Sequence, residues 1–235
     1  VSKATAARFF RRIGYSSFGQ ARRRARAEAD LASPLYALAG AKPKERPSDA
    51  LSRHVAADLR NLSDTFHPAH AAALPQVVKL LATAPRVRFV GMRNGHFVAA
   101  YGAYLLSQLR GEVGVLPGPA MTLAEDIASL GRGDAVVAVD FRRRSSLMQA
   151  VVKATRETGA KLVFVAGSGM PPLSPGRDLV LHCRTEGASL FDSYVGAVSL
   201  VNYLAGAVAV TLGRKSRKRL ADIESLHDTL ADIRP

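Results

Sequence analysis

Short apolar runs alternate with helix-like segments from Arg86 onward, and this alternation constrains the fold more than any other feature. The central run, residues 135–139, is unbroken and typical of a strand buried on both faces. An α/β fold with a doubly wound parallel sheet is therefore predicted. Its strands are expected at 87–90, 113–116, 135–139, 162–166 and 178–182, and its helices at 97–110, 123–130 and 146–158.

The segment after the central strand is rich in guanidinium and hydroxyl groups. It contains Asp140, Arg142, Arg143, Arg144, Ser145 and Ser146. Open α/β sheets bind anions at the carboxyl ends of their strands, beside helix N-termini whose first amides lack partners. The segment therefore predicts a receptor for phosphate or carboxylate. The alternative is that the arginines are solvated loop charges and that Ser145 or Ser146 caps the helix.

The positive charge is concentrated at the start of the chain. The formal net charge is +14, and residues 1–30 hold eight basic and two acidic residues, so 8 − 2 = +6 lies there. This density predicts a polyanionic partner, nucleic acid before membrane, and the alternative is a solvated basic face. Residues are expected to precede Val1, and no secretory leader pattern opens the chain.

Cysteine and histidine usage argues against disulfides and metals. Cys183 is the single cysteine, which excludes an intramolecular disulfide and a cysteine-cluster zinc site. His67 and His70 have no third candidate ligand nearby, so we predict no metal and no cofactor. A reducing compartment is favoured, and a cytoplasmic protein is expected.

Residues 2–13 predict a short basic helix. Ser2 is its N-cap, Ala6, Phe9 and Ile13 share one face, and Gly14 ends it. Small and basic residues on the other faces suit double-stranded DNA, because the backbone can approach the major groove while Lys and Arg engage phosphates or guanine edges. The predicted DNA contacts are Ser2, Lys3, Thr5, Arg8, Arg11 and Arg12.

This opening stretch resembles the recognition helix and following segment of the helix-turn-helix domain in RpiR-type transcriptional regulators. The matching residues are Val1, Ser2, Thr5, Arg8, Phe9, Gly14, Tyr15 and Phe18, with Ile13 where the family usually has leucine. The resemblance implies that residues 1–39 are the C-terminal part of a helix-turn-helix domain. A polar, proline-punctuated stretch at 40–47 predicts a linker, so a second domain is expected at 48–235.

Residues 74–233 resemble the sugar isomerase (SIS) domain, the effector-binding half of the same regulators. Gly91, Arg93, Asn94 and Gly95 resemble its first ligand loop, Asp134 begins the strand before its second, and Pro171, Pro172 and Leu173 resemble its serine-proline-leucine turn. Ser193 and Asn202 lie where the family's dimer-forming helix carries such residues. The resemblance implies a homodimer or homotetramer that senses a sugar phosphate.

Both ligand loops depart from the family's pattern. Gly95 replaces a serine that holds a sugar phosphate, and the segment from Asp140 to Ser145 replaces serine-x-serine-glycine-x-threonine. A guanidinium cluster with one carboxylate therefore takes the place of a hydroxyl cradle, which suits a phosphate, a carboxylate or a multiply charged ligand. The predicted effector residues are Arg93, Asn94, Gly95, His96, Asp140, Arg142, Arg143, Ser145, Ser146 and Ser168.

Helices are also predicted over 18–38, from Ser48 to residue 66, over 69–84, and in an amphipathic terminal run to residue 233. Val195–Leu212 is apolar enough to span a bilayer, and a basic cluster follows it. Its polar Ser199, Asn202 and Thr211, with many small residues, favour a buried or subunit-interface helix instead, so no membrane is predicted.

Two functions compete for this sequence. A sugar-phosphate isomerase needs a base and an acid, and His96 and Glu186 lie in places that could serve. Each is more simply interpreted as ligand-orienting or structural, and an isomerase has no use for a recognition helix. We therefore expect a DNA-binding transcriptional regulator, not an enzyme, whose SIS domain senses a small anionic metabolite such as a sugar phosphate or sugar acid.

Overall fold

The computed structural model describes residues 17, 20, 46–141, 145–167 and 178–232, except for the side chain of His70. Two compact units are distinguished, one of residues 1–54 with 187–192 and one of residues 55–186 with 193–235. All six predicted DNA contacts lie outside the described residues, as do the helix predicted over 18–38 apart from Gln20, residues 171–173, Arg142, Arg143 and Ser168. The second unit carries the sheet.

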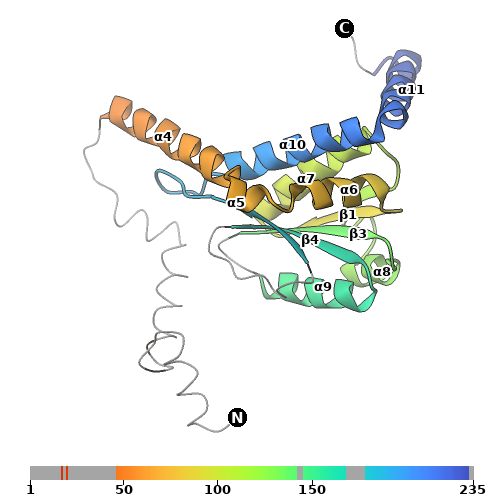
Figure 1. Cartoon of the computed structure of the whole chain (residues 1–235), viewed down its shortest axis with the longest axis horizontal. Helices are drawn as coiled ribbons and strands as arrows, with labels where there is room; N and C mark the ends of the chain where they lie inside the picture. The colour runs from red at the N-terminus through yellow and green to blue at the C-terminus, as the bar shows by residue number, and fades with distance from the viewer. Residues whose placement is uncertain (1–16, 18–19, 21–45, 142–144, 168–177, 233–235) are drawn as a thin grey trace. The chain divides into compact units, whose positions relative to one another are not determined.

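A single parallel sheet of five strands forms the centre of the second unit (Figure 1). The strand order is β2-β1-β3-β4-β5, and every neighbouring pair is parallel. The predicted α/β class is thereby confirmed. The strands are β1 (Val87–Gly91), β2 (Val113–Leu116), β3 (Ala135–Asp140), β4 (Lys161–Gly167) and β5 (Leu179–Cys183).

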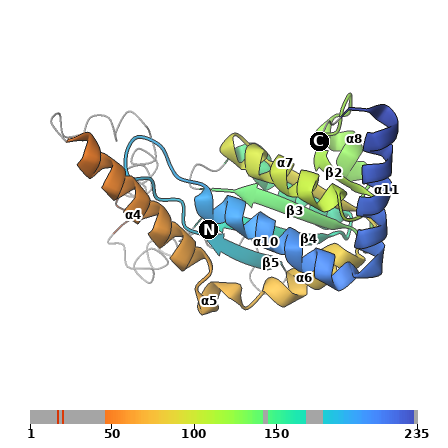
Figure 2. The ribbon, with the colours of Figure 1, turned by 90° about the horizontal axis from the view of Figure 1, so that it is seen from above.

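Helices cover both faces of the sheet. One face carries α6 (Leu74–Thr83), α7 (Asn94–Ser107) and α10 (Val195–Leu212), and the other carries α8 (Leu123–Ala128) and α9 (Ser146–Glu157) (Figure 1). Seen from above, α7 and α10 lie side by side over the sheet, and α11 (Arg214–Leu230) follows α10 (Figure 2). The helices α4 (Pro47–Thr65) and α5 (Pro68–Ala71) precede α6.

The alternation of side chains along the central strand explains why two helical layers are needed. Val137 and Val139 belong to the core beneath α6, α7 and α10, whereas Val136 and Ala138 belong to the core against α8 and α9. All four are fully buried. A strand that is apolar at every position requires cover on both faces, in agreement with the prediction from the unbroken run.

Several helix boundaries differ from prediction. The helices expected to end at residues 110 and 130 end earlier, at Ser107 and Ala128. The helix expected from residue 97 begins at Asn94, because a tight turn ends directly at the first helical residues. The helix expected over 69–84 is divided into α5 and α6, and Pro75 in the first turn of α6 cannot donate a backbone hydrogen bond. Ser48 is the predicted N-cap, but α4 begins at Pro47, a residue suited to a first helical position.

Asp134 ties the amino ends of β1 and β3 together. One of its carboxylate oxygens accepts hydrogen bonds from the Arg86 backbone and Nε, both at 3.2 Å. The other accepts from Arg86 Nη2 at 2.7 Å and from the Gly131 backbone at 2.8 Å. The Asp134 side chain is 4% exposed, so four donors compensate a carboxylate that is removed from water.

Among the described residues, α10 is the one helix with the length and composition to cross a membrane. Such a helix is weak evidence, because the core helix of a water-soluble fold has the same character. Seven of its residues are buried, including Leu200, Leu204 and Val208, which pack in the core with α6 and α7. Its inner face is therefore a core face, as predicted.

Candidate functional site at the carboxyl edge of the sheet

The strand order changes direction between β1 and β3. From β1 the chain moves outward to β2, and from β3 it moves the other way, to β4 and β5. The loops after β1 and β3 therefore leave the sheet side by side and turn apart. Such a switch point forms a crevice outside the carboxyl ends of the strands, where open α/β sheets bind their ligands. The described beginnings of two segments with predicted ligand residues, Arg93 after β1 and Asp140 at the end of β3, lie here.

Two glycines bring the start of α7 onto the ends of β1 and β3. A Cβ atom at Gly91 would lie 2.2 Å from the backbone oxygen of Gly95, and one at Gly95 would lie 2.6 Å from the backbone oxygen of Val139. Both distances are too short for any other residue without movement of the backbone. The absence of the family's serine at position 95 therefore has a steric reason in this chain: the first turn of α7 lies against β3.

Arg93 occupies a backbone conformation that normally belongs to glycine. Its φ of 55° and ψ of −127° match the first central position of a type II′ turn. The turn is closed by a hydrogen bond of 3.0 Å from the Gly95 backbone N–H to the Met92 carbonyl. Glycine is the usual residue at that position, and a larger residue there costs roughly 1–3 kcal/mol. The exposed Arg93 is therefore held at the carboxyl edge of the sheet by a strained turn.

Asn94, Phe141 and Tyr194 join the two loops to the start of α10. Asn94 Nδ2 donates to the Tyr194 hydroxyl at 3.1 Å. The rings of Tyr194 and Phe141 lie 4.9 Å apart between centroids. Phe141 is buried, and Tyr194 is the residue directly before α10. These contacts place an aromatic pair, with an amide and a phenol as polar groups, beside the carboxyl ends of β1 and β3.

Tyr194 is a residue of this group that the sequence does not predict. It stands at the beginning of a long apolar stretch, where it gives no sign of a contact with loops that lie far away in the chain. Its position becomes evident only when α10 returns over the sheet.

The described polar residues at the end of β3 and the start of α9 differ in burial and in their hydrogen bonds. Asp140 is buried at 5% exposure at the end of β3. Ser145 caps α9, because its hydroxyl accepts a hydrogen bond of 3.2 Å from the Leu147 backbone. Ser146 is exposed in the first turn of the helix. Ser145 therefore caps the helix, as one of the two interpretations of the sequence predicted. Its hydroxyl accepts in the cap and can still donate a hydrogen bond to a ligand at the helix N-terminus.

An ion-pair cluster follows β5. Arg184 pairs with Asp64 of α4 and donates to Glu186 at 2.6 Å. The hydrogen bonds from Arg184 to Glu186 and Asp64 raise the pKa of Arg184. The buried Asn61 donates to the Glu186 backbone carbonyl at 2.8 Å, which anchors this segment to α4. The Glu186 carboxylate is therefore occupied by a cation.

The predicted effector residues are thus partly assembled. The turn with Arg93, Asn94 and Gly95 lies at the switch point, next to Asp140 at the end of β3. His96 is exposed in the first turn of α7, where its ring contacts that of Phe97. The roles of all these side chains in binding remain predictions. Within the described part of the chain, no group of three or more His, Cys, Asp or Glu residues is arranged to hold a metal ion.

Curated relatives match only part of their own length. The chain is 24% identical over 149 residues to the bifunctional protein glk of Burkholderia pseudomallei, which covers 63% of this chain and 23% of that protein. A second such protein, from Burkholderia thailandensis, is 26% identical over 145 residues, 60% of this chain and 22% of its own length. The chain therefore spans about a quarter of the length of the curated relatives it matches.

Solved structures share the fold more extensively. The sugar isomerase domain of an RpiR transcription factor from Sphaerobacter thermophilus is 25% identical, with a TM-score of 0.67 over 74% of this chain and 97% of that one. The Vibrio vulnificus NanR protein complexed with ManNAc-6P is 18% identical, with a TM-score of 0.68 over 98% of this chain and 82% of that one. A phosphoheptose isomerase from Francisella tularensis is 14% identical, with a TM-score of 0.58 over 70% of this chain and 99% of that one.

The SIS domain family matches residues 80–207, more than half of the 235 residues. The match spans the sheet from β1 to β5 and extends into α10, so it includes both loops at the switch point. The chain therefore belongs to the SIS domain family.

Proposed function

We propose that this chain is part of a cytoplasmic DNA-binding transcriptional regulator, with the end of a helix-turn-helix domain at 1–39, a linker at 40–47 and an SIS effector domain at 48–235. The effector is a small anionic metabolite, a sugar phosphate or a sugar acid, bound at the carboxyl edge and not chemically changed. The similar NanR structure, which holds ManNAc-6P, supports this class of ligand. The basic residues at the start of the chain support the DNA partner.

The strained turn at Arg93 is the observation that carries the effector proposal. Folding gains nothing from an arginine in a glycine conformation, so a charged side chain there is best explained by a ligand. Arginine recognises phosphate and carboxylate through paired donors. Arg142, Arg143 and Ser168 are proposed to complete the site together with Asn94, His96, Asp140, Ser145 and Ser146.

A sugar-phosphate isomerase is the second candidate, since the phosphoheptose isomerase of similar structure has the same fold. Isomerisation needs a base that is free to take a proton. The Glu186 carboxylate is engaged by Arg184 and is therefore not free to take a proton, which favours the regulator.

Replacement of Arg8 by alanine is expected to weaken DNA binding several-fold, because Arg8 is proposed to neutralise a phosphate in the complex. The measurement is a gel-shift titration of the full-length regulator against a palindromic duplex selected from a random pool, at several salt concentrations. The affinity should fall steeply with salt for the unchanged protein and less steeply for the variant.

The matched control is Arg132→Ala, which removes the same charge from an exposed position just before β3. It should bind the duplex as well as the unchanged protein does. Binding that does not respond to salt, or an equal loss in both variants, would contradict the placement of the recognition helix.

The outer faces of α7 and α10 are proposed to pair with a second copy of the chain. Val198, Asn202, Gly206 and Val210 recur every four residues on the exposed side of α10, and Val210 is 83% exposed. The neighbouring α7 exposes Phe97 at 72% and Tyr104 at 61%. Several large apolar side chains exposed on two neighbouring helices are typical of a protein interface.

Replacement of Gly206 by leucine tests this interface. The substitution should be stabilising if α10 faces solvent and should weaken self-association if α10 packs against a second copy. No atom lies within 4 Å of a Cβ placed at Gly206. In a monomer, leucine should therefore stabilise α10 by about 0.5–1 kcal/mol through its higher helix propensity. In a dimer that packs a second helix here, it should weaken self-association at least about ten-fold through overpacking.

Sedimentation velocity over a range of protein concentrations measures the association. Gly131→Ala is the control, because its Cβ also has no neighbour within 4 Å and the residue lies away from α7 and α10. A monomeric unchanged protein, or a Gly206→Leu variant that dimerises normally, would refute the interface.

A further inference from the structure

The helix α4 reverses the usual distribution of polar and apolar residues. Its three buried residues are Ala57, Asn61 and Thr65, whereas the large apolar side chains of Val55 and Leu59 are exposed. No residue of α4 belongs to either of the two apolar cores that the described residues form. A helix in a folded domain is normally stabilised by the burial of an apolar face, so α4 must be attached by other contacts.

These contacts are polar and come from the segment after β5. Arg184 pairs with Asp64 and donates to the Glu186 carboxylate. The Arg184 backbone N–H donates to the Thr65 hydroxyl at 3.3 Å, and Asn61 Nδ2 donates to the Glu186 carbonyl at 2.8 Å. These five residues form the α4 clasp.

The hydrogen bonds of the α4 clasp are incomplete. Asn61 Oδ1 and Arg184 Nε are buried, and neither atom has a hydrogen-bond partner among the described residues. A partly satisfied polar cluster is less stable than an apolar contact of the same size, because each unpaired atom has lost its hydration. The Asp64 and Glu186 side chains are 43% and 68% exposed, so water can replace Arg184 at both carboxylates. The clasp therefore holds α4 less firmly than an apolar core would.

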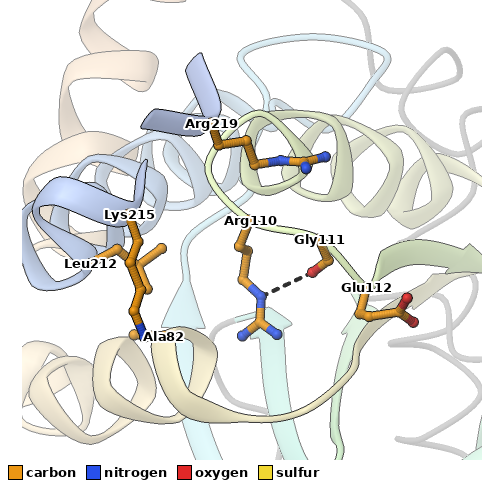
Figure 3. Close-up of a pocket in the computed structure, with 7 residues that line it drawn as sticks. All are labelled: Ala82, Arg110, Gly111, Glu112, Leu212, Lys215 and Arg219. Atoms are coloured by element: carbon orange, nitrogen blue, oxygen red, sulfur yellow. Dashed lines mark hydrogen bonds between the residues drawn. The ribbon is translucent and has the colours of Figure 1, made fainter. Parts of the chain in front are cut away.

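The next long helix, α6, is attached in the ordinary way. Leu74, Val77 and Leu81 are buried in the apolar core. Arg110, which lies in the wall of a pocket at the amino edge of the sheet (Figure 3), also donates to the carbonyls of Leu81 and Ala84 at 2.8 and 2.6 Å. An opening of α4 can therefore end before α6, which stays fixed to the sheet.

The first turn of α10 connects the α4 clasp to the carboxyl edge of the sheet. A Cβ atom at Gly196 would lie 2.5 Å from the Thr65 hydroxyl oxygen and 3.4 Å from the Arg184 carbonyl oxygen, so this turn packs directly against the clasp. Two residues earlier, Tyr194 accepts a hydrogen bond from Asn94, in the turn after β1. A change at Asn94 can therefore reach α4 through one turn of helix.

We propose that α4 opens and closes on the SIS domain as a unit, held in the closed form by the α4 clasp, and that the carboxyl edge of the sheet sets the balance between the two forms. Elements with few buried apolar contacts open locally at a lower free-energy cost than unfolding of the whole domain. The balance responds to Asn94 and Tyr194 because their contact supports the turn of α10 against which α4 closes.

The use of this opening rests on the proposed function. In the proposed regulator α4 follows the linker at 40–47, so an effector that contacts Asn94 would change how the DNA-binding residues are held. The opening itself requires neither DNA nor effector and is measured without them. A chain that binds neither would contradict the proposed function and leave the exchange results below unchanged.

Native-state amide hydrogen exchange of the whole chain, followed by mass spectrometry, measures the opening of α4. Arg184→Met removes both ion-pair contacts of the α4 clasp, so exchange in residues 57–65 should accelerate at least about ten-fold. Lys218→Met is the matched control, because it removes a cation from the surface pair with Asp222 on α11. It should leave exchange in α4 within about two-fold of that in the unchanged protein. Exchange in β3 reports on the global fold and should stay slow in both variants.

Tyr194→Phe tests the connection to the carboxyl edge. It removes the hydroxyl that accepts from Asn94, and exchange in residues 57–65 should accelerate at least about two-fold. Tyr104→Phe, at an exposed position of α7, is the control and should have no effect. Slow α4 exchange in Arg184→Met, or α4 amides that exchange only together with those of β3, would overturn the opening of α4. A response to Arg184→Met without any response to Tyr194→Phe would overturn the connection to the carboxyl edge.

Discussion

Replacement of Asp134 by alanine is expected to lower the free energy of unfolding by about 3 kcal/mol, the lower part of the range for breaking a buried ion pair. The variant leaves the Arg86 guanidinium without its carboxylate and the Gly131 backbone N–H without its acceptor. Arg86 is 33% exposed and can recover some hydration, which places the loss at the low end. The loss in the free energy of unfolding is measured by urea unfolding monitored by circular dichroism, because the chain has no Trp for a fluorescence signal.

Asp222→Ala is the matched control, because its carboxylate pairs with Lys218 on the surface of α11, with side chains 58% and 77% exposed. Its loss should be less than about 0.5 kcal/mol, as for other exposed pairs four residues apart on a helix. A similar loss in both variants would mean that the Asp134 pair contributes no more than a surface pair.

The contribution of Asp134 should depend on pH in a defined direction. Burial raises the pKa of Asp134, but the hydrogen bonds from Arg86 and Gly131 and the charge of Arg86 outweigh it, so the pKa is lowered in the folded protein. Its stabilisation is therefore complete above the unfolded-state value of about 4 and is lost as the pH falls through the folded-state value. The stability difference between the unchanged protein and Asp134→Asn should narrow below about pH 4.

Replacement of Arg93 by glycine should change ligand binding and stability in opposite directions. Loss of a charge-assisted hydrogen bond should weaken the binding of an anionic effector at least about ten-fold. The same change removes the strain of the positive φ, and after the entropy cost of glycine we expect a gain of about 1 kcal/mol in the free energy of unfolding. A residue with a purely structural role would not combine weaker ligand binding with higher stability when it is replaced.

A thermal-shift screen of sugar phosphates and sugar acids, each beside its uncharged sugar, identifies the ligand and then compares the variants. Ala120→Gly is the control, since Ala120 also has a positive φ, of 60°, but carries no charge. It should raise stability without affecting the ligand. A neutral sugar as the sole hit, or undiminished binding by Arg93→Gly, would refute the anion site, and turnover of a hit would favour the isomerase.

The fold class follows from the sequence because it depends on local patterns. The run at 135–139 is apolar at every position, and such a strand is stable only between two layers of helices. The observed strands begin and end within about one residue of the predicted ones for the same reason. The polar segments after β1 and β3 were also identifiable, because guanidinium and hydroxyl groups directly after buried strands are uncommon unless they contact solvent or a ligand.

The order of the strands was decided by the tertiary structure. Only the pairing of β1 with β3 brings the two loops together, and that pairing depends on contacts between segments far apart in the chain. Tyr194 contacts the loop after β1 because α10 packs back over α7. The glycine-like conformation of Arg93 contradicts local preference, and it occurs in a turn flanked by Gly91 and Gly95, whose backbones pack closely against each other and against β3. Local sequence determines which elements form, whereas long-range packing determines which of their ends meet.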